Sequence, residues 1–387
     1  MHRMGQEEID AVSRVINSKN LFKVNKGGQE TLHAEEELCA LTGAENSLIM
    51  TSGHAALVSA LVAAGIGPGD QVIVPAYTYI ATPIAVLAAG AIPVICEIDE
   101  SLTLDPDDLE NKITPYTKAI MPVHMLGLPC KMDKIMAVAK KHGLLVIEDA
   151  CQALGATFGG KMVGTIGDAG AYSFNFYKII STGEGGALVT DNLDLYQKAL
   201  IYHDSSAVCF FGNQMDGVSV EPFVGSEYRT NEIQAAILRE QMKRLDGIVD
   251  DLHRVKNYIT KGISGKFKVL EANEGGKEQA AQIVILTDTP EEAAKLSEYL
   301  GGASVIVNTK KHVYNGWGSV MNKRGHLNPL MDPFLHEANK DIIPDYRPDM
   351  CQKSLDILSK AVLKGISSEW TETEMDELIA HILAFES

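Results

Sequence analysis

The most constraining feature of the sequence is an alternation of short, wholly apolar runs with helical patterns between about residues 45 and 190. The runs at 72–75 and 144–147 have no polar position, whereas a strand with one face in water would alternate apolar and polar residues. Helical patterns such as 54–65 separate the runs. Short apolar strands between helices predict an α/β fold with a largely parallel sheet covered on both faces.

After Asn192 the pattern becomes helical, with apolar spacing typical of a helix through about residues 228–260. A smaller α/β segment follows, and the chain ends in a helix preceded by the capping-box pattern Thr371…Glu374. We therefore predict a large domain at 1–245 with a mostly parallel central sheet and a smaller C-terminal α/β domain at 246–387. The N-terminal stretch that begins at Met1 predicts an amphipathic helix, and the small domain is its candidate packing partner.

The charge balance limits the kinds of partner. The net charge of −17 argues against nucleic acid or an anionic membrane, because both require a basic surface. The apolar stretch 72–96 is long enough to span a bilayer, but three prolines and a glycine divide it into a strand, a helix and a strand. The N-terminus has no apolar signal-peptide core.

The six cysteines include no C-x-x-C pair, so no zinc ribbon, thioredoxin motif or other metal site is expected. Cys96 and Cys151 lie in apolar runs and are interpreted as small core residues. We expect reduced thiols and a cytoplasmic location.

Ligands of parallel α/β sheets bind beyond the carboxyl ends of the strands. The first such end is "TSGHAAL" at 51–57, where Gly53 allows a tight turn and the next helix presents free N–H groups. These features describe a phosphate cradle, although an ordinary strand–turn–helix corner would have the same sequence.

The second strand end is "VIEDACQA", in which Glu148 and Asp149 directly follow four apolar residues. A buried carboxylate is costly without a cationic partner, and a protonated pyridine nitrogen would be such a partner. A helix cap or a structural ion pair is the alternative.

The third strand end is "SFNFYK", where Ser173 precedes Lys178 by five residues. A serine hydroxyl can bind phosphate there, and a desolvated lysine can attack a carbonyl. The alternative is a surface lysine that reaches solvent. The glycine-rich turn "TGEGG" follows at 182–186.

A phosphate cradle, a strand-end aspartate and a later Ser-x4-Lys are together what pyridoxal 5′-phosphate requires. In this combination the chain resembles the DegT/DnrJ/StrS-type sugar aminotransferases, a branch of the fold-type I pyridoxal-phosphate enzymes. The resemblance runs from about Gly5 to the C-terminal helix. It is carried by "TSGHAAL", "PAYTYIATPIAVLAAGAIPV", "PVHMLGLPCKMD", "VIEDACQALGA" and "SFNFYKIISTGEGGALVT", with "YRTNEIQAA" and "TETEMDELI".

The resemblance implies a role for each matching residue. Lys178 matches the Schiff-base lysine and Asp149 the partner of the pyridine nitrogen. The remaining cofactor contacts match Gln152 near the ring hydroxyl, Tyr79 stacked on the ring, and Ser173 with the backbone of Gly53, His54 and Ala55 at the phosphate. Members of the family are homodimers with shared active sites, so a homodimer is expected.

Several positions depart from the family. His54 stands where threonine is usual, and its imidazole could add charge to the phosphate site. Glu227 stands where an asparagine usually reaches the neighbouring subunit's phosphate, which a carboxylate would repel.

The family's "PLH" signature is replaced by residues 310–334, which we expect to shape the acceptor pocket. Substrate candidates there are His312 and Tyr314, with Trp317, Lys323 and Arg324, although each could equally be a packing or loop residue. Arg229 could bind a substrate carboxylate or pair with Glu232 on its helix.

These roles imply a ping-pong transamination in which Lys178 acts as nucleophile and as general acid/base. Glutamate or glutamine would donate the amine, and a keto sugar, nucleotide-linked in our first interpretation, would accept it. The main alternative acceptor is a cyclitol of the inosose type.

Three other functions are possible on the same fold. A pyridoxamine-dependent sugar dehydratase would carry histidine in place of Lys178. A desulfurase or other lyase would need a mobile catalytic cysteine, and the sequence shows no clear loop for one. A non-enzymatic regulator would be expected to lose Lys178 or Asp149 first.

Overall fold

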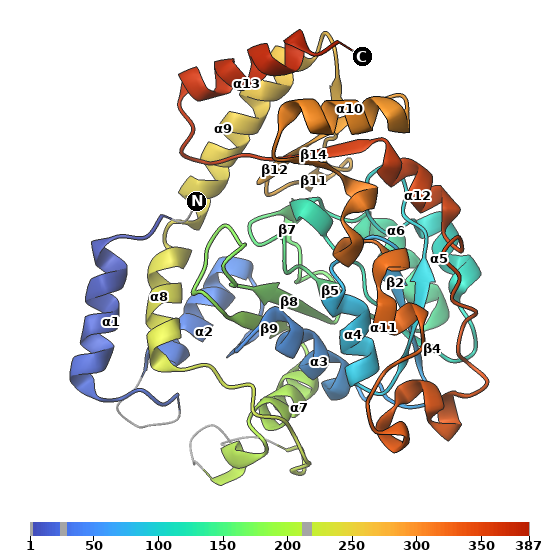
Figure 1. Ribbon diagram of the computed structural model, residues 1–387. Coiled ribbons are helices and arrows are strands. Elements are labelled where there is room, and N and C mark those ends of the chain that lie inside the picture. Colours follow the sequence, from blue (N-terminus) through green and yellow to red (C-terminus); the bar gives the residue numbers. More distant parts are fainter. Residues whose placement is uncertain (1–2, 24–28, 211–218, 387) are drawn as a thin grey trace.

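The computed structural model describes residues 3–23, 29–210 and 219–386. Its centre is a seven-stranded sheet in the order β1-β9-β8-β5-β4-β2-β3 (Figure 1). Neighbouring strands are parallel except at β9, which is antiparallel to both β1 and β8. The predicted, largely parallel sheet is confirmed. Its strands are β1 (Asn46–Met50), β2 (Gln71–Pro75), β3 (Ile92–Cys96), β4 (Thr117–Ile120), β5 (Leu145–Asp149), β8 (Ala169–Ser173) and β9 (Gly186–Thr190).

Helices pack on both faces of this sheet. One buried cluster joins the sheet to α3, α4 and α7. A second cluster joins the sheet to α5 and α6, and a third joins it to α2 and α8. The helix α3 is apolar on nearly all sides, and it is stable because the sheet, α4 and α7 bury it. The helices are α2 (Glu30–Thr42), α3 (Gly53–Ala63), α4 (Ala81–Ala88), α5 (Pro106–Lys112), α6 (Met132–His142), α7 (Leu193–His203) and α8 (Glu232–Met242).

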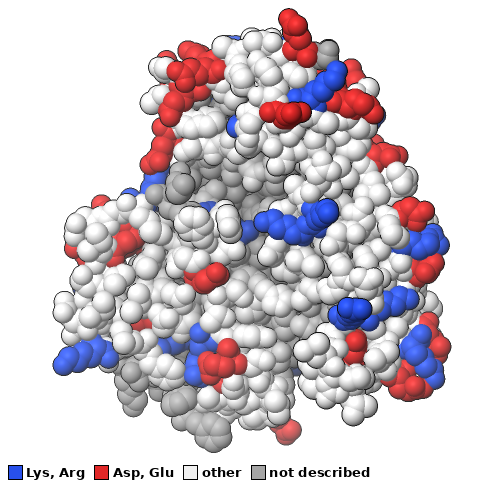
Figure 2. Space-filling model, viewed as in Figure 1, with Lys and Arg blue, Asp and Glu red and all other residues white. Residues whose placement is uncertain are grey.

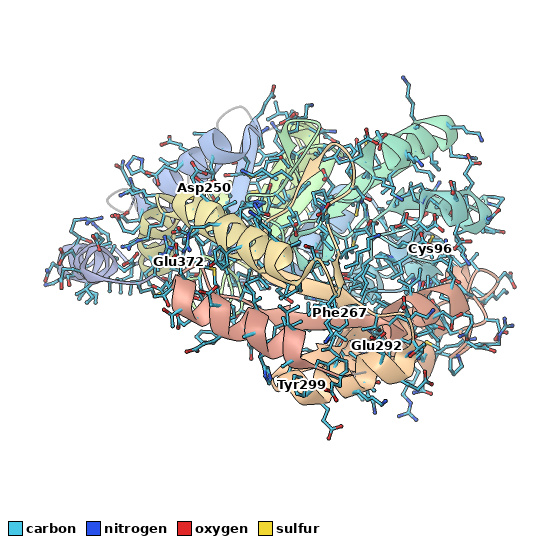
Figure 3. The ribbon with its side chains drawn as sticks, turned by 90° about the horizontal axis from the view of Figure 1, so that it is seen from above. Cys96, Asp250, Phe267, Glu292, Tyr299 and Glu372 are labelled. Atoms are coloured by element: carbon cyan, nitrogen blue, oxygen red, sulfur yellow. The ribbon has the colours of Figure 1, made fainter. Side chains whose placement is uncertain are left out.

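A second, antiparallel sheet lies above the first in the view of Figure 1, in the order β10-β12-β14-β13. Seen from above, α9 and α13 run side by side (Figure 3), and Phe267 and Tyr299 both contact the ring of Phe385. The elements are β10 (Lys268–Val269), β12 (Gln282–Leu286), β13 (Ala303–Val305), β14 (Ala361–Gly365), α9 (Leu245–Ile263), α10 (Pro290–Leu300) and α13 (Glu372–Ala384). The capping box predicted at Thr371 and Glu374 is present.

Three short strands form a further sheet beside the two larger ones: β11 (Gly276–Lys277), β6 (Thr157–Phe158) and β7 (Lys161–Met162). In the part of the chain that the structure describes, no helix combines the length and apolarity needed to cross a membrane.

Much of the segment 306–360 packs on the large sheet, although it lies within the predicted small domain. The amide of Thr78 donates to the carbonyl of His312 at 2.9 Å, and the Tyr346 hydroxyl donates to the carbonyl of Pro93 at 2.6 Å. The segment includes α11 (Gly318–Met321) and α12 (Gln352–Ser359). Its apolar residues are far apart in sequence from the sheet edge that they cover, so local patterns could not place them.

The N-terminal helix α1 (Gln6–Ser18) packs on α8 through Ala11, Val15 and Ala236. Beyond it, Arg3 pairs with Asp251 of α9 at 2.6 Å. The first two residues of the predicted helical stretch lie outside the described residues.

The helical pattern that we predicted from residue 228 begins later, at Glu232. Tyr228 and Arg229 are extended, and the Tyr228 carbonyl accepts the amide of Thr51 at 2.9 Å. This pairing places the segment beside the end of β1, and tertiary contact therefore overrides the local helical pattern.

Gly186, at the start of β9, lies against the turn that leads into α3. A Cβ atom at this position would lie 2.2–2.4 Å from backbone atoms of Ser52 and Gly53. We predict that Gly186→Ala lowers the free energy of unfolding by about 1–3 kcal/mol, because backbone atoms must shift to make room. Urea or thermal unfolding measures this effect.

Gly247→Ala is the matched control, since no neighbouring atom lies within 4 Å of its Cβ position in α9. Alanine favours the helix by up to about 1 kcal/mol, so this variant should be as stable as the wild type or more so. Equal stability of the two variants would contradict the close contact at Gly186.

Candidate functional site

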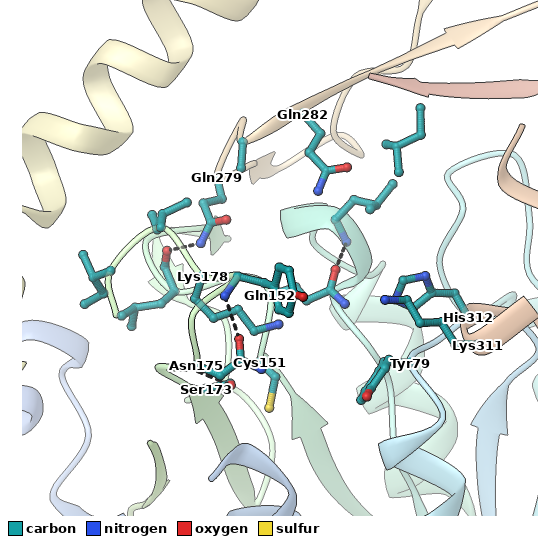
Figure 4. A pocket seen from close by; sticks show the side chains of 17 residues that line it. Tyr79, Cys151, Gln152, Ser173, Asn175, Lys178, Gln279, Gln282, Lys311 and His312 are labelled. Carbon is teal, nitrogen blue, oxygen red and sulfur yellow. Dashed lines mark hydrogen bonds between the residues drawn. The ribbon is translucent and has the colours of Figure 1, made fainter. Parts of the chain in front are cut away.

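Two adjoining cavities open at the carboxyl ends of β5 and β8. The smaller, of about 270 Å³, reaches the N-terminus of α3, and the larger, of about 320 Å³, reaches the second sheet. Figure 4 shows the larger cavity, with Gln279 and Gln282 on its upper side and Lys178, Cys151 and Gln152 below. The residues common to both cavities are Tyr79, Cys151, Gln152, Ser173, Asn175 and Lys178.

Lys178 lies where the two cavities meet. Asn175 forms a turn before it: its side-chain oxygen accepts the amide of Tyr177 at 3.1 Å, and its carbonyl accepts the amide of Lys178 at 3.0 Å. Burial lowers the pKa of the Lys178 amine, and the nearby Lys311 lowers it further, while Asp149 acts in the opposite direction. The lysine is thus desolvated, as a nucleophilic amine requires.

Asp149 ends β5 and lines the smaller cavity with only 5% of its surface exposed. One carboxylate oxygen accepts the hydroxyl of Thr82 at 2.7 Å, and the other accepts the amide of Cys151 at 3.1 Å. Both donors are neutral, so no cation among the described residues offsets the charge through a direct contact. The carboxylate is therefore available to a cationic group of a ligand.

Glu148 has a different role because adjacent strand residues point to opposite faces. Its carboxylate is fully buried and accepts the amides of Gly164, Ile166 and Gly167 at 2.7–2.8 Å. Nε2 of His124 is 2.9 Å from the same carboxylate. Glu148 is thus a structural residue, which corresponds to one of the alternatives considered for this strand end.

The N-terminus of α3 faces the smaller cavity through Ser52, Gly53 and His54. The Ser52 hydroxyl accepts the amide of Ala55 at 3.0 Å and thereby caps the helix. The phosphate contact expected at the Ala55 amide is therefore occupied in this arrangement. The amides of Gly53 and His54 and the hydroxyl of Ser173 remain for an anion.

The extra charge considered for His54 is not supported. Burial lowers the pKa of its imidazole, and Nδ1 lies 3.3 Å from the carbonyl of Ala81. The ring is accordingly neutral near pH 7 and can contribute a hydrogen bond but no full charge.

One wall of the larger cavity brings together Gln152, Tyr79 and His312. The Gln152 side-chain oxygen accepts the amide of Leu126 at 3.2 Å. Tyr79 lines both cavities, and its ring centroid is 5.6 Å from that of His312. Burial lowers the pKa of His312 to about 4, and two nearby lysines add to this effect.

Two residues that we predicted to bind substrate, Tyr314 and Arg229, lie outside both cavities. Tyr314 has no exposed surface, and its hydroxyl donates to the carbonyl of Pro348 and accepts the amide of Cys351. It is a core residue, and Trp317 is buried beside it in the same cluster.

Arg229 lines neither cavity, and it does not form the pair with Glu232 that was the alternative to substrate binding. Its guanidinium pairs with the buried Asp204 and, at 2.8 Å, with Glu227. Glu232 instead accepts the amides of the first residues of α2. Because Glu227 pairs within its own chain, its carboxylate is directed to Arg229.

Cys151 is more than a core residue, since its side chain lines both cavities. Burial raises the pKa of its thiol well above the ordinary value, and the Asp149 carboxylate adds to this effect. The thiol is therefore protonated at neutral pH and weakly nucleophilic. Cys96, in contrast, is fully buried as predicted.

Local sequence patterns did not identify the residues that close the larger cavity from remote segments. Gln279, Gln282 and Leu363 come from the region of the second sheet, and Lys311 comes from the segment that covers the large sheet. The only local signal was the pair of lysines before His312, which is unremarkable by itself.

A model of the DegT/DnrJ/EryC1/StrS aminotransferase family matches residues 2–316 of the chain. The GDP-perosamine synthase of Caulobacter vibrioides is 44% identical over 226 residues, which cover 58% of this chain and 59% of that protein. A Micromonospora echinospora protein named for an L-glutamine:3-amino-2,3-dideoxy-scyllo-inosose aminotransferase activity is 35% identical over 277 residues, or 69% of this chain and 64% of that protein. Both matches span less than two thirds of the relative's length.

A solved structure of NtdA from Bacillus subtilis with bound cofactor PMP superimposes with a TM-score of 0.77 at 25% identity. The match covers 98% of this chain and 81% of that chain, so it includes both sheets.

The environment of Lys178 leads to a prediction about its acidity. We expect its amine to titrate below the ordinary lysine value of about 10.4, because burial disfavours the ammonium form. Lys311→Met should raise this pKa, since it removes a nearby positive charge. The pH dependence of acetylation in the cofactor-free protein, followed at each site by mass spectrometry, measures both values.

Lys310 provides the control for the reagent, because it is exposed and lines neither cavity. A Lys178 midpoint at the ordinary value, or one unaffected by Lys311→Met, would contradict the electrostatic description of the site.

Proposed function

The chain belongs to the DegT/DnrJ/EryC1/StrS aminotransferase family, and from this membership we propose that it is a pyridoxal-phosphate-dependent transaminase. Its amino donor is glutamate or glutamine, and its acceptor is a keto sugar. We favour an acceptor that is linked to a nucleotide. The similarity to a GDP-perosamine synthase supports a nucleotide-linked acceptor.

The observation that carries this proposal is the meeting of two cavities at a desolvated lysine. Lys178 lines both, Asp149 lines the smaller one, and the larger one continues to the second sheet. This arrangement gives one compartment for a cofactor and one for a substrate, with a reactive amine between them.

The residues of the smaller cavity fit pyridoxal phosphate. The buried Asp149 carboxylate has no cation in direct contact within the part of the chain that the structure describes, and it can hold a protonated ring nitrogen. The free amides of Gly53 and His54 at the start of α3, together with the Ser173 hydroxyl, can hold the phosphate. Lys178 would attach the cofactor through its amine, with Tyr79 and Gln152 beside the ring.

When bound, the cofactor supplies a carbonyl carbon that exchanges amino groups and a conjugated ring that withdraws electrons. The Lys178 amine removes the proton from Cα of the donor, a task for which its lowered pKa suits it. The Thr82 hydroxyl and the Cys151 amide hold the Asp149 carboxylate in place, where it would pair with a protonated ring nitrogen. Lys178 then returns a proton to the acceptor carbon in the second half of the ping-pong cycle.

A cyclitol acceptor is the second candidate, and the similarity to an inosose aminotransferase favours it. A desulfurase is disfavoured because Cys151, the cysteine that lines both cavities, is a protonated thiol held at the end of β5. A sugar dehydratase is disfavoured because lysine, not histidine, occupies position 178.

The expected homodimer with shared active sites and the cytoplasmic location are also part of the proposal. All six cysteines are free thiols, which agrees with a reducing compartment. The assembly can be measured by light scattering on the holoenzyme.

We predict that Lys178→Ala abolishes covalent attachment of the cofactor and lowers turnover by about 10³-fold or more, since one amine serves as nucleophile and proton carrier. Borohydride reduction followed by mass spectrometry measures the attachment. Lys310→Ala is the control and should retain both properties. Normal turnover in Lys178→Ala would refute the assignment.

Amine transfer itself is the second test. We expect glutamate or glutamine to aminate at least one member of a panel of nucleotide-linked keto sugars, free keto sugars and inososes, with one 2-oxo acid released per amine transferred. Product analysis by mass spectrometry distinguishes the acceptors. Release of ammonia or sulfide without an aminated product would instead indicate a lyase.

A further inference from the structure

The larger cavity is lined by basic side chains, and by no acidic one among the described residues, although the protein as a whole is strongly acidic. Its titratable lining residues include Lys178, Lys311 and His312, and none of its described lining residues is Asp or Glu. The chain as a whole has a net charge of −17. On the face shown in Figure 2, most acidic side chains lie toward the periphery, and basic side chains lie at the central hollow. This distribution favours an anionic ligand in the larger cavity.

Lys311 is fixed at the wall of this cavity by its backbone. Its carbonyl accepts the amide of Ile80 at 3.0 Å and the indole N–H of Trp317 at 3.3 Å. The next residue, His312, accepts the amide of Thr78. The segment that carries Lys311 is therefore tied to the loop that carries Tyr79.

The side chain of Lys311 lines the same cavity as the reactive lysine and lies beside the residue that precedes it. Its ammonium lies 5.9 Å from the centre of the Tyr177 ring, and Tyr177 immediately precedes Lys178. Its charge also contributes to the lowered pKa of Lys178. Among the described residues, no carboxylate forms an ion pair with this ammonium. Lys311 is therefore a cation close to the reaction centre that is free to bind an anion.

We propose that Lys311 binds the α-carboxylate of the amino-acid donor, an inference that rests on the proposed transaminase function. The α-carboxylate is bonded to the same carbon as the reacting amine, so it must lie close to the Lys178 amine. A cation whose field reaches Lys178 is in the right region for that group. The phosphates of a nucleotide-linked acceptor are several bonds from the ketone and would lie farther out.

Amide groups complete a site for a carboxylate. Gln282 of β12 lines the cavity from above, and Asn175 lines it from below (Figure 4). Gln279 is less available because its side-chain N–H already donates to the carbonyl of Leu154 at 2.8 Å. Lys311 thus takes the role considered above for Arg229, which is occupied by Asp204 and Glu227.

The test compares glutamate with 4-aminobutyrate, which keeps the amine and the distal carboxylate but lacks the α-carboxylate. We expect Lys311→Met to raise the dissociation constant for glutamate by about ten- to a hundredfold, as for the loss of a hydrogen bond to a charged group. The constant for 4-aminobutyrate should stay within about twofold. Single-turnover kinetics on the holoenzyme give both values.

A second measurement does not depend on turnover. 2-Methylglutamate has no proton on Cα and cannot complete the reaction, so calorimetry measures its binding alone. Its affinity should fall in Lys311→Met by the same factor as that of glutamate. Lys310→Met is the matched control, since it removes an adjacent exposed lysine that lines neither cavity.

Three outcomes would overturn the inference. Equal weakening of glutamate and 4-aminobutyrate would place the distal carboxylate at Lys311. Unchanged glutamate binding, with weakened binding of uridine or guanosine diphosphate, would assign Lys311 to a nucleotide. If the wild-type protein transaminates no amino acid, the proposed function is refuted. If the wild type transaminates normally and Lys311→Met binds glutamate as tightly as the wild type, only the role of Lys311 is refuted.

Discussion

The carboxylate of Glu148, which no solvent reaches, organises the sheet edge on which the site is built. Removing such a charge from water costs several kcal/mol unless hydrogen bonds replace the water. Three backbone amides from residues 164–167 and the ring of His124 supply them. These bonds join β5 to two loops and leave the next residue, Asp149, facing the opposite side of the sheet. One buried acid thereby fixes the position of the acid that faces the cavity.

The electrostatics of the site follow from the unequal distribution of charge. Asp149 lines the smaller cavity, Lys311 lines the larger one, and Lys178 lines both. Lys178 stands between them, and its ammonium form is disfavoured by burial and by Lys311 more than Asp149 can offset. A group that must be neutral to attack a carbonyl, and must afterwards carry a proton, benefits from a pKa below the ordinary lysine value. The fold achieves this with neutral donors on Asp149 in place of a direct ion pair.

The sequence predicted well what is decided locally. Apolar runs between helices specified the parallel sheet, and the strand-end residues Asp149, Ser173 and Lys178 do lie together. The failures concern contacts between distant segments. Arg229 binds Asp204, 25 positions earlier in the chain, and Tyr314 is buried because residues 306–360 return to cover the large sheet. No periodicity or spacing reports such contacts. The capping of Ala55 by Ser52 was readable locally, since serine at this position is a frequent N-cap.

The same difference explains why the reaction class is easier to infer than the substrate. The residues that fit the cofactor come mainly from the strand ends of one sheet and the turns beside them, so a few motifs describe them. The walls of the larger cavity come from separate segments, which contribute Leu126, Lys311, Gln282 and Leu363 among others. Each of these residues is ordinary in its own sequence context. Their combined shape and charge arise only when the second sheet and the covering segment are both in place, and that combination must select the acceptor.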